Sequence, residues 1–237
     1  MIKKIKGIVI KEIDYKDTSK IIEVITSSGI YSIIAKGAKN VKSPLFSGTS
    51  YLSYSEFCIY EKSSISTLKS VDLISVFKNA MKDIVKISAS AYLVNLCVQV
   101  YKQNNSSEIY DLLLYGINKI DSGINTLGVV NIIEIKLLKY LGLELHLNGC
   151  TICGSKNISY LSLDYSGYLC SSCTNAKMDK KILKLIKMYD VINLSKLENF
   201  NVSKDILLQI DKFIDEYYDK YTGLYLQNKK MFNELMR

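Results

Sequence analysis

The first third of the chain consists of short apolar runs separated by turn-forming residues. Ser27, Ser28 and Gly29 form one such turn, and the loop 36–44 holds the only proline. The apolar and β-branched runs lie at residues 7–13, 20–26, 30–35, 49–60 and 65–76. Runs of this length bounded by Gly and Ser predict β-strands. Five strands with no helical period between the first three favour a small closed barrel. The OB-fold is the first choice, and an SH3-like barrel is the alternative.

From about residue 79 the apolar residues recur at spacings of three and four, which predicts amphipathic helices. The predicted helices begin near residues 79, 109, 125, 178 and 203. Ser106 or Ser107 and Ser203 are candidate N-caps, and Gly142 is a candidate C-cap. The predicted fold class is therefore α+β. An OB-fold domain at residues 1–78 precedes an all-α domain at 79–237, which carries a cysteine module at 146–176.

Two Cys-x-x-Cys pairs dominate the candidate chemistry of that module, Cys150 with Cys153 and Cys170 with Cys173. A two-residue spacer lets a tight turn aim both sulfurs at one ion, and Gly154 suits such a turn because Gly accepts positive φ. Four thiolates leave no open coordination position. We therefore predict one structural Zn²⁺ per chain, bound by these four cysteines.

Two disulfides, or one redox-active Cys-x-x-Cys pair, would use the same residues. Disulfide frameworks belong to secreted proteins, whereas lysines interrupt the apolar residues at the N-terminus and leave no signal-peptide core. Cys58 and Cys97 lie in apolar runs and are expected to be buried thiols. His146, the only histidine, is expected to be a packed bystander near the module.

The chain of 237 residues carries a formal charge of +8, which favours an anionic partner. Thirty of its 31 basic residues are lysines. No phosphate-binding loop, His-Glu-x-x-His or Gly-x-Ser-x-Gly motif occurs, and one histidine provides few acid–base options. Asp and Glu residues such as Asp215 stand among lysines and are expected on solvated faces. We therefore predict a protein that is not an enzyme. The chain contains no run of about 18 uncharged apolar residues, so we predict no membrane span.

Lysines of the predicted barrel fall at strand ends and loops and are interleaved with Tyr15, Tyr31 and Phe46. An OB-fold binds single strands by stacking bases on aromatic rings while cations follow the phosphates. The candidate DNA-binding residues are Lys11, Lys16, Lys20, Lys36, Lys39 and Lys42. A second cationic stripe, at residues 177–187, opposes the apolar face of the helix after the cysteine module. It is either a solvated face or a further contact surface.

Four segments carry a distinctive combination of motifs: the Gly7–Lys11 strand, the Ala35-Lys36-Gly37-Ala38-Lys39 loop, the helix 134–142 and the cysteine module with Gly167-Tyr168-Leu169 before its second pair. Together they resemble the RecO family, bacterial DNA repair proteins that act as recombination mediators. Lys36 and Lys39 match the basic loop of the family. Asn40 departs from it, because a second basic residue is frequent at this position.

The resemblance implies a protein that binds single- and double-stranded DNA and anneals complementary strands. It further implies that, with RecR, the protein loads RecA onto DNA coated with single-strand binding protein. The C-terminal tail of single-strand binding protein is an expected partner, and an apolar pocket near lysines in the helical domain is its expected site. The expected location is the cytoplasm, with association to the nucleoid when bound to DNA.

Two alternatives remain at this point. One is a zinc-ribbon and OB-fold adaptor that binds proteins and does not contact DNA directly. The other is a zinc-bearing hydrolase or redox enzyme, which would require an open coordination site or a reversible Cys-x-x-Cys couple.

Overall fold

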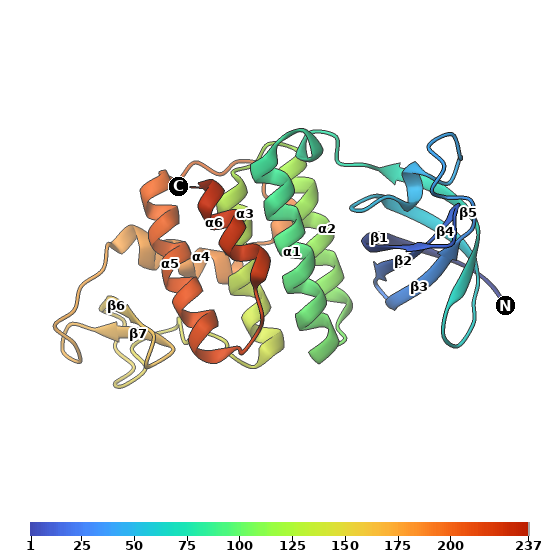
Figure 1. The fold of residues 1–237 in the computed structure, drawn as a ribbon. Helices are drawn as coiled ribbons and strands as arrows, with labels where there is room; N and C mark the ends of the chain where they lie inside the picture. Colours follow the sequence, from blue (N-terminus) through green and yellow to red (C-terminus); the bar gives the residue numbers. More distant parts are fainter. Residues whose placement is uncertain (237) are drawn as a thin grey trace. The chain divides into compact units, whose positions relative to one another are not determined.

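The computed structural model describes residues 1–236, without the side chain of Gln227. It begins with five strands that form a closed barrel in the order β1-β2-β3-β5-β4 (Figure 1). The strands are β1 (Ile2–Tyr15), β2 (Ser19–Thr26), β3 (Gly29–Ala35), β4 (Tyr54–Tyr60) and β5 (Ser66–Ser75). The strands β3 and β5 pair in parallel, and the other neighbours are antiparallel. The predicted fold class, an OB-like barrel followed by helices, is confirmed.

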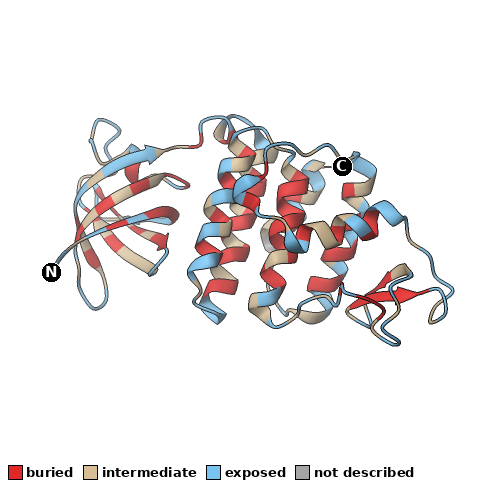
Figure 2. Cartoon of the chain, turned by 180° about the vertical axis from the view of Figure 1, so that it is seen from behind, coloured by how far each residue is buried: buried red, intermediate tan, exposed pale blue. Residues whose placement is uncertain are grey.

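The long strand β1 closes the barrel because it pairs with β4 through its first half and with β2 through its second half. A register shift between Val9 and Lys11 marks the bulge that bends the strand between these partners. Gly7 lies where the strands approach most closely, since a Cβ there would stand 2.4 Å from the carbonyl oxygen of Ile25. Inward-facing residues including Ile22, Ile33 and Phe57 are fully buried (Figure 2).

The predicted fourth strand begins later than its apolar run does. Residues 47–49 form a 3₁₀ helix, η1 (Ser47–Thr49), and β4 starts only at Tyr54. The hydroxyl groups of Thr49 and Ser50 donate to the carbonyls of Leu45 and Phe46 at 2.6 and 2.8 Å. Such local side-chain bonds offer the backbone an alternative to the ladder, and a periodicity argument does not see them.

Two antiparallel helices follow the barrel, α1 (Ile84–Gln103) and α2 (Ser107–Asp121), after the short η2 (Ala80–Lys82). Ser106 caps α2 by accepting the backbone N–H of Glu108, as predicted. Helix α1 is long and apolar enough, by length and composition, to cross a membrane, a property that our sequence criterion missed. Of its most apolar 18-residue window, 56% is buried, as in the core helix of a globular fold.

The remaining elements are α3 (Thr126–Leu137), η3 (Leu138–Leu141), β6 (Ile158–Ser162), β7 (Gly167–Cys170), α4 (Lys180–Val191), η4 (Leu194–Lys196), α5 (Lys204–Tyr221) and α6 (Gln227–Met236). Helix α3 packs against both α4 and α5. Gly142 ends η3 with a φ of 69°, as predicted for a C-cap. Ser203 occupies the N-cap of α5, but its side chain makes no capping hydrogen bond. We did not predict α6.

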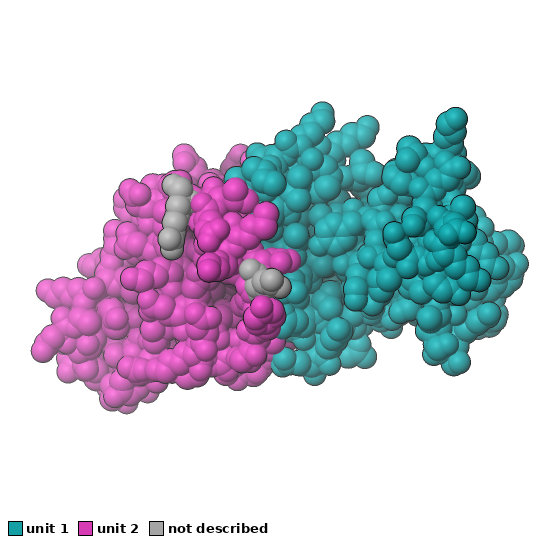
Figure 3. Space-filling model, viewed as in Figure 1, with its two compact units in different colours: residues 1–122 teal, residues 123–237 magenta. Residues whose placement is uncertain are grey.

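By its internal contacts the chain forms two compact units, Met1–Ser122 and Gly123–Arg237 (Figure 3). The helices α1 and α2 thus group with the barrel, whereas the predicted domain boundary lies at residue 78. The compact units are defined by contacts, and contacts do not report which segment folds alone as a domain. The boundary at residue 78 stays a prediction.

Candidate metal centre and nucleic-acid interface

The first cysteine pair lies on a turn that its own backbone closes. The N–H of Gly154 donates to the carbonyl of Cys150 at 2.8 Å, and the N–H of Cys150 donates to the carbonyl of Ser155 at 2.9 Å. Gly154 adopts a φ of +74°, as the sequence predicted. The second pair repeats this design, because the N–H groups of Cys173 and Thr174 donate to the carbonyl of Cys170 at 3.0 and 3.1 Å.

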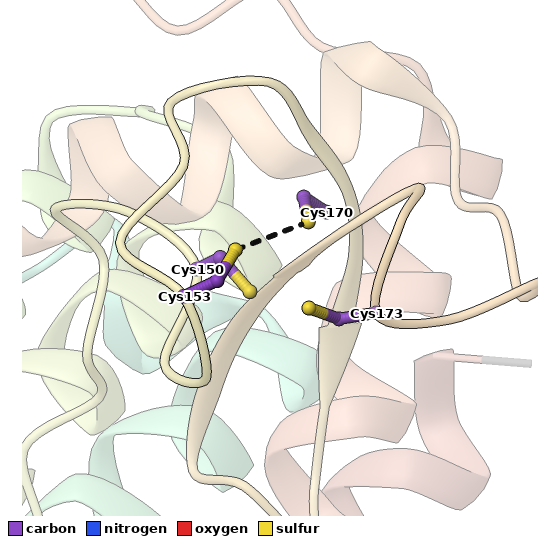
Figure 4. Close-up of side chains that lie close together, drawn as sticks. All are labelled: Cys150, Cys153, Cys170 and Cys173. Atoms are coloured by element: carbon purple, nitrogen blue, oxygen red, sulfur yellow. Dashed lines mark hydrogen bonds between the residues drawn. The ribbon is translucent and has the colours of Figure 1, made fainter.

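The two turns bring the four sulfurs together at the end of the β6–β7 hairpin (Figure 4). All four Sγ atoms lie within 4.8 Å of one another, and those of Cys153 and Cys170 are 3.5 Å apart. Ligands in a tetrahedron with Zn–S bonds of ~2.3 Å are about 3.8 Å apart, whereas a disulfide requires about 2.05 Å. All six cysteines of the chain are free thiols. The spacing therefore fits a tetrahedral metal and not two disulfides.

The thiols of the cluster differ in acidity. Burial alone would raise the pKa of Cys150, but hydrogen bonds from the backbone of Cys153, Cys170 and Ile152 lower it to about 6. The pKa of Cys170 is also lowered: burial acts against this shift, and hydrogen bonds from Cys153 and from its own turn outweigh burial. The pKa of Cys173 is raised to about 12, chiefly because it donates to the sulfurs of Cys153 and Cys170. In the first cysteine of each pair, the direction of the pKa shift favours the thiolate, the form that binds metal.

The cluster has a small apolar core of its own. Cys150, Leu169 and Cys170 are buried together, and Ile158 and Tyr160 pack against them. The backbone of His146 pairs with the hairpin by accepting the N–H of Tyr168 at 3.0 Å. The side chain of His146 is exposed, so the prediction that it packs is wrong. Since four cysteines complete a tetrahedron, the site suits a closed structural ion, with zinc favoured by the all-sulfur donor set.

On the barrel, the structure brings together two of the loops that carry candidate DNA-binding lysines. The loop after β3 folds onto the β1–β2 turn, because the N–H of Lys39 donates to the carbonyl of Thr18 at 3.0 Å. Lys36 and Lys42 are exposed on this loop, and Lys16 is exposed on the turn with its ammonium 5.4 Å from the Tyr15 ring. We call these four lysines, Lys16, Lys36, Lys39 and Lys42, the lysine corner.

Three of the candidate lysines have carboxylate partners. The ammonium of Lys39 lies 2.9 Å from Asp14, and that of Lys11 lies 3.9 Å from Glu23 across the strand pair. Lys20 differs from both, because its side chain is only 4% exposed and contacts Glu12 at 2.6 Å. The ring of Phe46 covers the same ammonium at 5.5 Å. In this conformation Lys20 joins β2 to β1 through Glu12 and is not available to a phosphate.

A cleft near Tyr31 was missed by the sequence reasoning. It has a volume of about 510 Å³ and lies between the first residues of β3 and the β4–β5 loop. Its lining residues are Ile30, Tyr31, Ser32, Glu61, Lys62, Ser63, Ser64 and Ser66. Lys3 donates to the Tyr31 hydroxyl at 2.8 Å, and this bond lowers the pKa of Tyr31. In OB-folds the β2–β3 face and the β4–β5 loop bind oligonucleotides. The cleft forms only where β3 and the β4–β5 loop come together, so the pattern of the sequence alone does not reveal it.

The cationic stripe of residues 177–187 lies mostly on α4, with Lys177 before the helix, beside a groove of about 390 Å³. Apolar atoms of Ile158, Tyr168 and Leu183 line this groove, together with Lys156, Lys180, Lys184 and Lys187. Lys180 and Lys184 are exposed, whereas Lys187 donates to the side chain of Asn148 at 2.7 Å. We call this surface the α4 groove. It combines an apolar floor with a cationic rim.

Comparisons with known proteins account for nearly the whole chain. Residues 1–77 match the family model described as recombination protein O N terminal, and residues 81–230 match the one described as recombination protein O C terminal. Among curated relatives, the DNA repair protein RecO of Bacillus pumilus is 27% identical, over 99% of this chain and 95% of its own length. Those of Listeria monocytogenes and Exiguobacterium sibiricum are each 28% identical, over 98% and 100% of this chain and 94% and 98% of their own lengths.

Proposed function

Since the chain belongs to the RecO family of DNA repair proteins, which act in recombination, we propose that its barrel binds single- and double-stranded DNA and anneals complementary strands. The lysine corner is the observation that carries this proposal. It places exposed ammonium groups on two adjoining loops of an OB-like barrel, where a phosphate backbone can contact several of them.

Lysine suits a reader of backbone charge. Its ammonium is a point charge without the planar fork with which arginine recognises guanine, so contacts from these residues carry little sequence information. When such contacts neutralise phosphates on two strands, repulsion between the strands falls while bases pair. The barrel would thus promote annealing through binding alone, and the function requires no catalytic turnover.

Reversing two charges of the lysine corner tests the proposal. Lys36 and Lys42 are exposed, so the variant K36E/K42E should fold normally and bind a short single strand at least tenfold more weakly at ~0.1 M salt. The slope of log affinity against log salt should fall by roughly 1.4, because each phosphate contact on a single strand contributes about 0.7. Fluorescence anisotropy at several salt concentrations measures both quantities.

A matched control is K78E/K82E, which makes the same charge change at two exposed lysines outside the five strands. This control should retain most of the affinity and of the salt slope. Equal loss in both variants would show that net charge, and not the lysine corner, governs binding. Full affinity in K36E/K42E would instead favour the adaptor function, in which the barrel binds a protein.

We further propose that the α4 groove accepts the acidic C-terminal tail of single-strand binding protein. Its apolar floor can hold an apolar side chain while Lys180 and Lys184 face carboxylates, a combination that a peptide with both features satisfies. With RecR, this contact would let the protein load RecA onto coated DNA. These steps would take place in the cytoplasm, on the nucleoid.

A tail peptide titrated against K180E/K184E tests the α4 groove. We expect at least a fivefold loss of affinity, because two attractive contacts become repulsive. The variant K196E/K204E changes the same charge at exposed lysines elsewhere in the second unit and should bind the peptide as the unaltered protein does. No binding by the unaltered protein would remove the tail from the proposal and leave DNA binding untouched.

The proposed cofactor is one Zn²⁺ per chain on Cys150, Cys153, Cys170 and Cys173. Its role would be structural, since the four sulfurs use every tetrahedral position and none remains for a reacting water. Bound there, the ion would join the two cysteine turns across the β6–β7 hairpin. The hairpin residues Ile158 and Tyr168 in turn line the α4 groove.

A further inference from the structure

Helix α6 is attached to its unit through a buried ion cluster. The ammonium of Lys229 lies 2.8 Å from Glu134 of α3, and 2.7 and 3.3 Å from Asp211 and Asp215 of α5. The side chain of Lys229 is 7% exposed. Among the described residues, this one ammonium contacts all three carboxylates. The cluster therefore selects a cation at one particular position of α6.

Two further side chains complete the contact. The ring of Phe232, three residues after Lys229, is fully buried, and Asn233 donates to Asp215 at 2.7 Å. The other large apolar residues of the helix face solvent more, since Met231 is 52% and Leu235 is 37% exposed. Helix α6 thus docks through a short motif of one lysine, one aromatic ring and one amide.

The surface that receives α6 is assembled without it. Helices α3 and α5 are joined directly, because Tyr218 donates to the carbonyl of Glu134 at 2.8 Å and Asn131 donates to the carbonyl of Leu207 at 3.1 Å. Two open hollows of about 300 and 260 Å³ flank α6, and Asp215 and Asn233 line both. The receiving groove is therefore larger than the helix that occupies it.

A short connection outside both helices joins α6 to α5. Helix α5 ends at Tyr221, and Gly223 adopts a φ of +62° in the turn that follows. Removing one partner of a buried ion cluster leaves the other charges uncompensated, so the three carboxylates disfavour a helix that lacks a cation at this position. Short elements held by few apolar contacts open before the rest of a fold does.

We propose that α6 is a displaceable plug in a helix-docking groove on α3 and α5, and that this groove accepts a partner helix presenting a lysine and an aromatic residue three positions apart. Helix α6 itself shows the chemistry that the groove selects. The groove lies in the helical unit and involves none of the residues assigned to DNA or to the acidic tail, so the proposal stands independently of the proposed function.

A labelled synthetic peptide with the sequence of residues 224–237 tests the proposal on the full-length chain. In the chain variant K229M, helix α6 loses its ammonium. The carboxylates of Glu134, Asp211 and Asp215 then become available to the lysine of the peptide. We expect the peptide to bind K229M at least tenfold more tightly than the unaltered chain. A second peptide, with methionine in place of the lysine that corresponds to Lys229, should bind K229M at least tenfold more weakly than the first.

A second chain variant, F232A, weakens the plug through its aromatic anchor and keeps every charge. If K229M fails to fold, F232A tests the proposal in its place. F232A should also bind the first peptide more tightly than the unaltered chain does, and its residues 227–236 should exchange amide hydrogens at least tenfold faster while α5 stays protected. Equal binding of the two peptides, or no binding to either variant, would overturn the proposal.

Discussion

At the scale of single residues, burial decides what each ionisable group contributes. Lys20 and Lys229 have the side-chain chemistry of any surface lysine, yet both are nearly inaccessible and each contacts carboxylates. Asp215 was expected on a solvated face, and it is instead half-buried beside Lys229. A charged residue gives no sign of this in the sequence, because its partners come from elements up to 95 positions away.

Glu134 should make the stability of the second unit depend on pH. Burial is the largest cause that raises its pKa to about 7, and the attraction of Lys229 opposes that shift. The folded state therefore binds a proton more tightly than the unfolded state, so stability should fall as pH rises from 6 to 8. The raised pKa of Lys229 adds no pH dependence to the stability between pH 6 and 8, since its charge is lost only above pH 10.

The variant E134Q isolates this effect. Its amide keeps the shape of the side chain and cannot ionise, so its stability should vary less with pH than that of the unaltered protein. The difference in the free energy of unfolding between E134Q and the unaltered protein should change by about 1–2 kcal/mol between pH 6 and 8. This figure is smaller than the whole pKa shift implies, because the charges of the cluster are coupled. Urea unfolding followed by circular dichroism measures it, and parallel pH profiles would contradict the assignment.

Gly7 should tolerate no side chain. A Cβ at this position would meet the carbonyl oxygen of Ile25 at 2.4 Å and the side chain of Val24 at 2.5 Å. The variant G7A must push β1 away from β2, and overpacking of this kind costs roughly 1–3 kcal/mol. We expect a lower urea midpoint for the barrel, and K6A, at the exposed neighbouring residue, should leave that midpoint nearly unchanged.

At the scale of elements, the cysteine module should behave as one cooperative piece. The variant C170S removes a proposed metal ligand and one of the three buried residues of its small core. Zinc content should fall from one to nearly none per chain, and the β6–β7 hairpin should lose protection from hydrogen exchange. DNA affinity should stay within about twofold, because the lysine corner lies in the other compact unit.

The half-buried thiol of Cys58 on β4 provides the control for this prediction. The variant C58S should keep its zinc, as measured by elemental analysis of the purified protein. Loss of zinc in both variants would point to a general folding defect. Retention of zinc in C170S would show that the four sulfurs do not act as one ligand set.

The sequence predicted elements well where a periodic pattern dominated. All five barrel strands and the first five α-helices were expected, as were the Gly142 and Gly154 turns. The segment 49–53 was wrongly assigned to a strand, because serine and threonine hydroxyls bond to nearby carbonyls there. Helix α6 was missed because its anchors are Lys229 and Phe232, which do not make the apolar stripe that a periodicity search requires.

The candidate site divides in the same way. Cys-x-x-Cys spacing fixes the local turn, so the four cysteines could be grouped from the sequence and the structure places them together. That they bind zinc stays a proposal. The lysines could be proposed only as a set, since pairing across strands decides which are accessible. The cleft beside Tyr31 and the α4 groove arise from tertiary packing, and no local pattern announces them.

At the scale of the whole molecule, the lysine corner and the α4 groove belong to different compact units. We therefore expect their contributions to be independent. K36E/K42E should lose DNA affinity and keep the affinity for the acidic tail peptide, and K180E/K184E should show the reverse. Substitutions far apart, with no shared partners, usually add to within about 0.5 kcal/mol.

Combining the four substitutions tests that independence. In each binding assay the quadruple variant should match the relevant double variant to within about twofold, because the remote pair contributes only through net charge. In an annealing assay on strands coated with single-strand binding protein, the two losses should multiply, since the proposed function uses the DNA contact and the coat-protein contact independently. A quadruple variant that anneals coated strands no worse than the weaker double variant would mean that the two surfaces act in a single step.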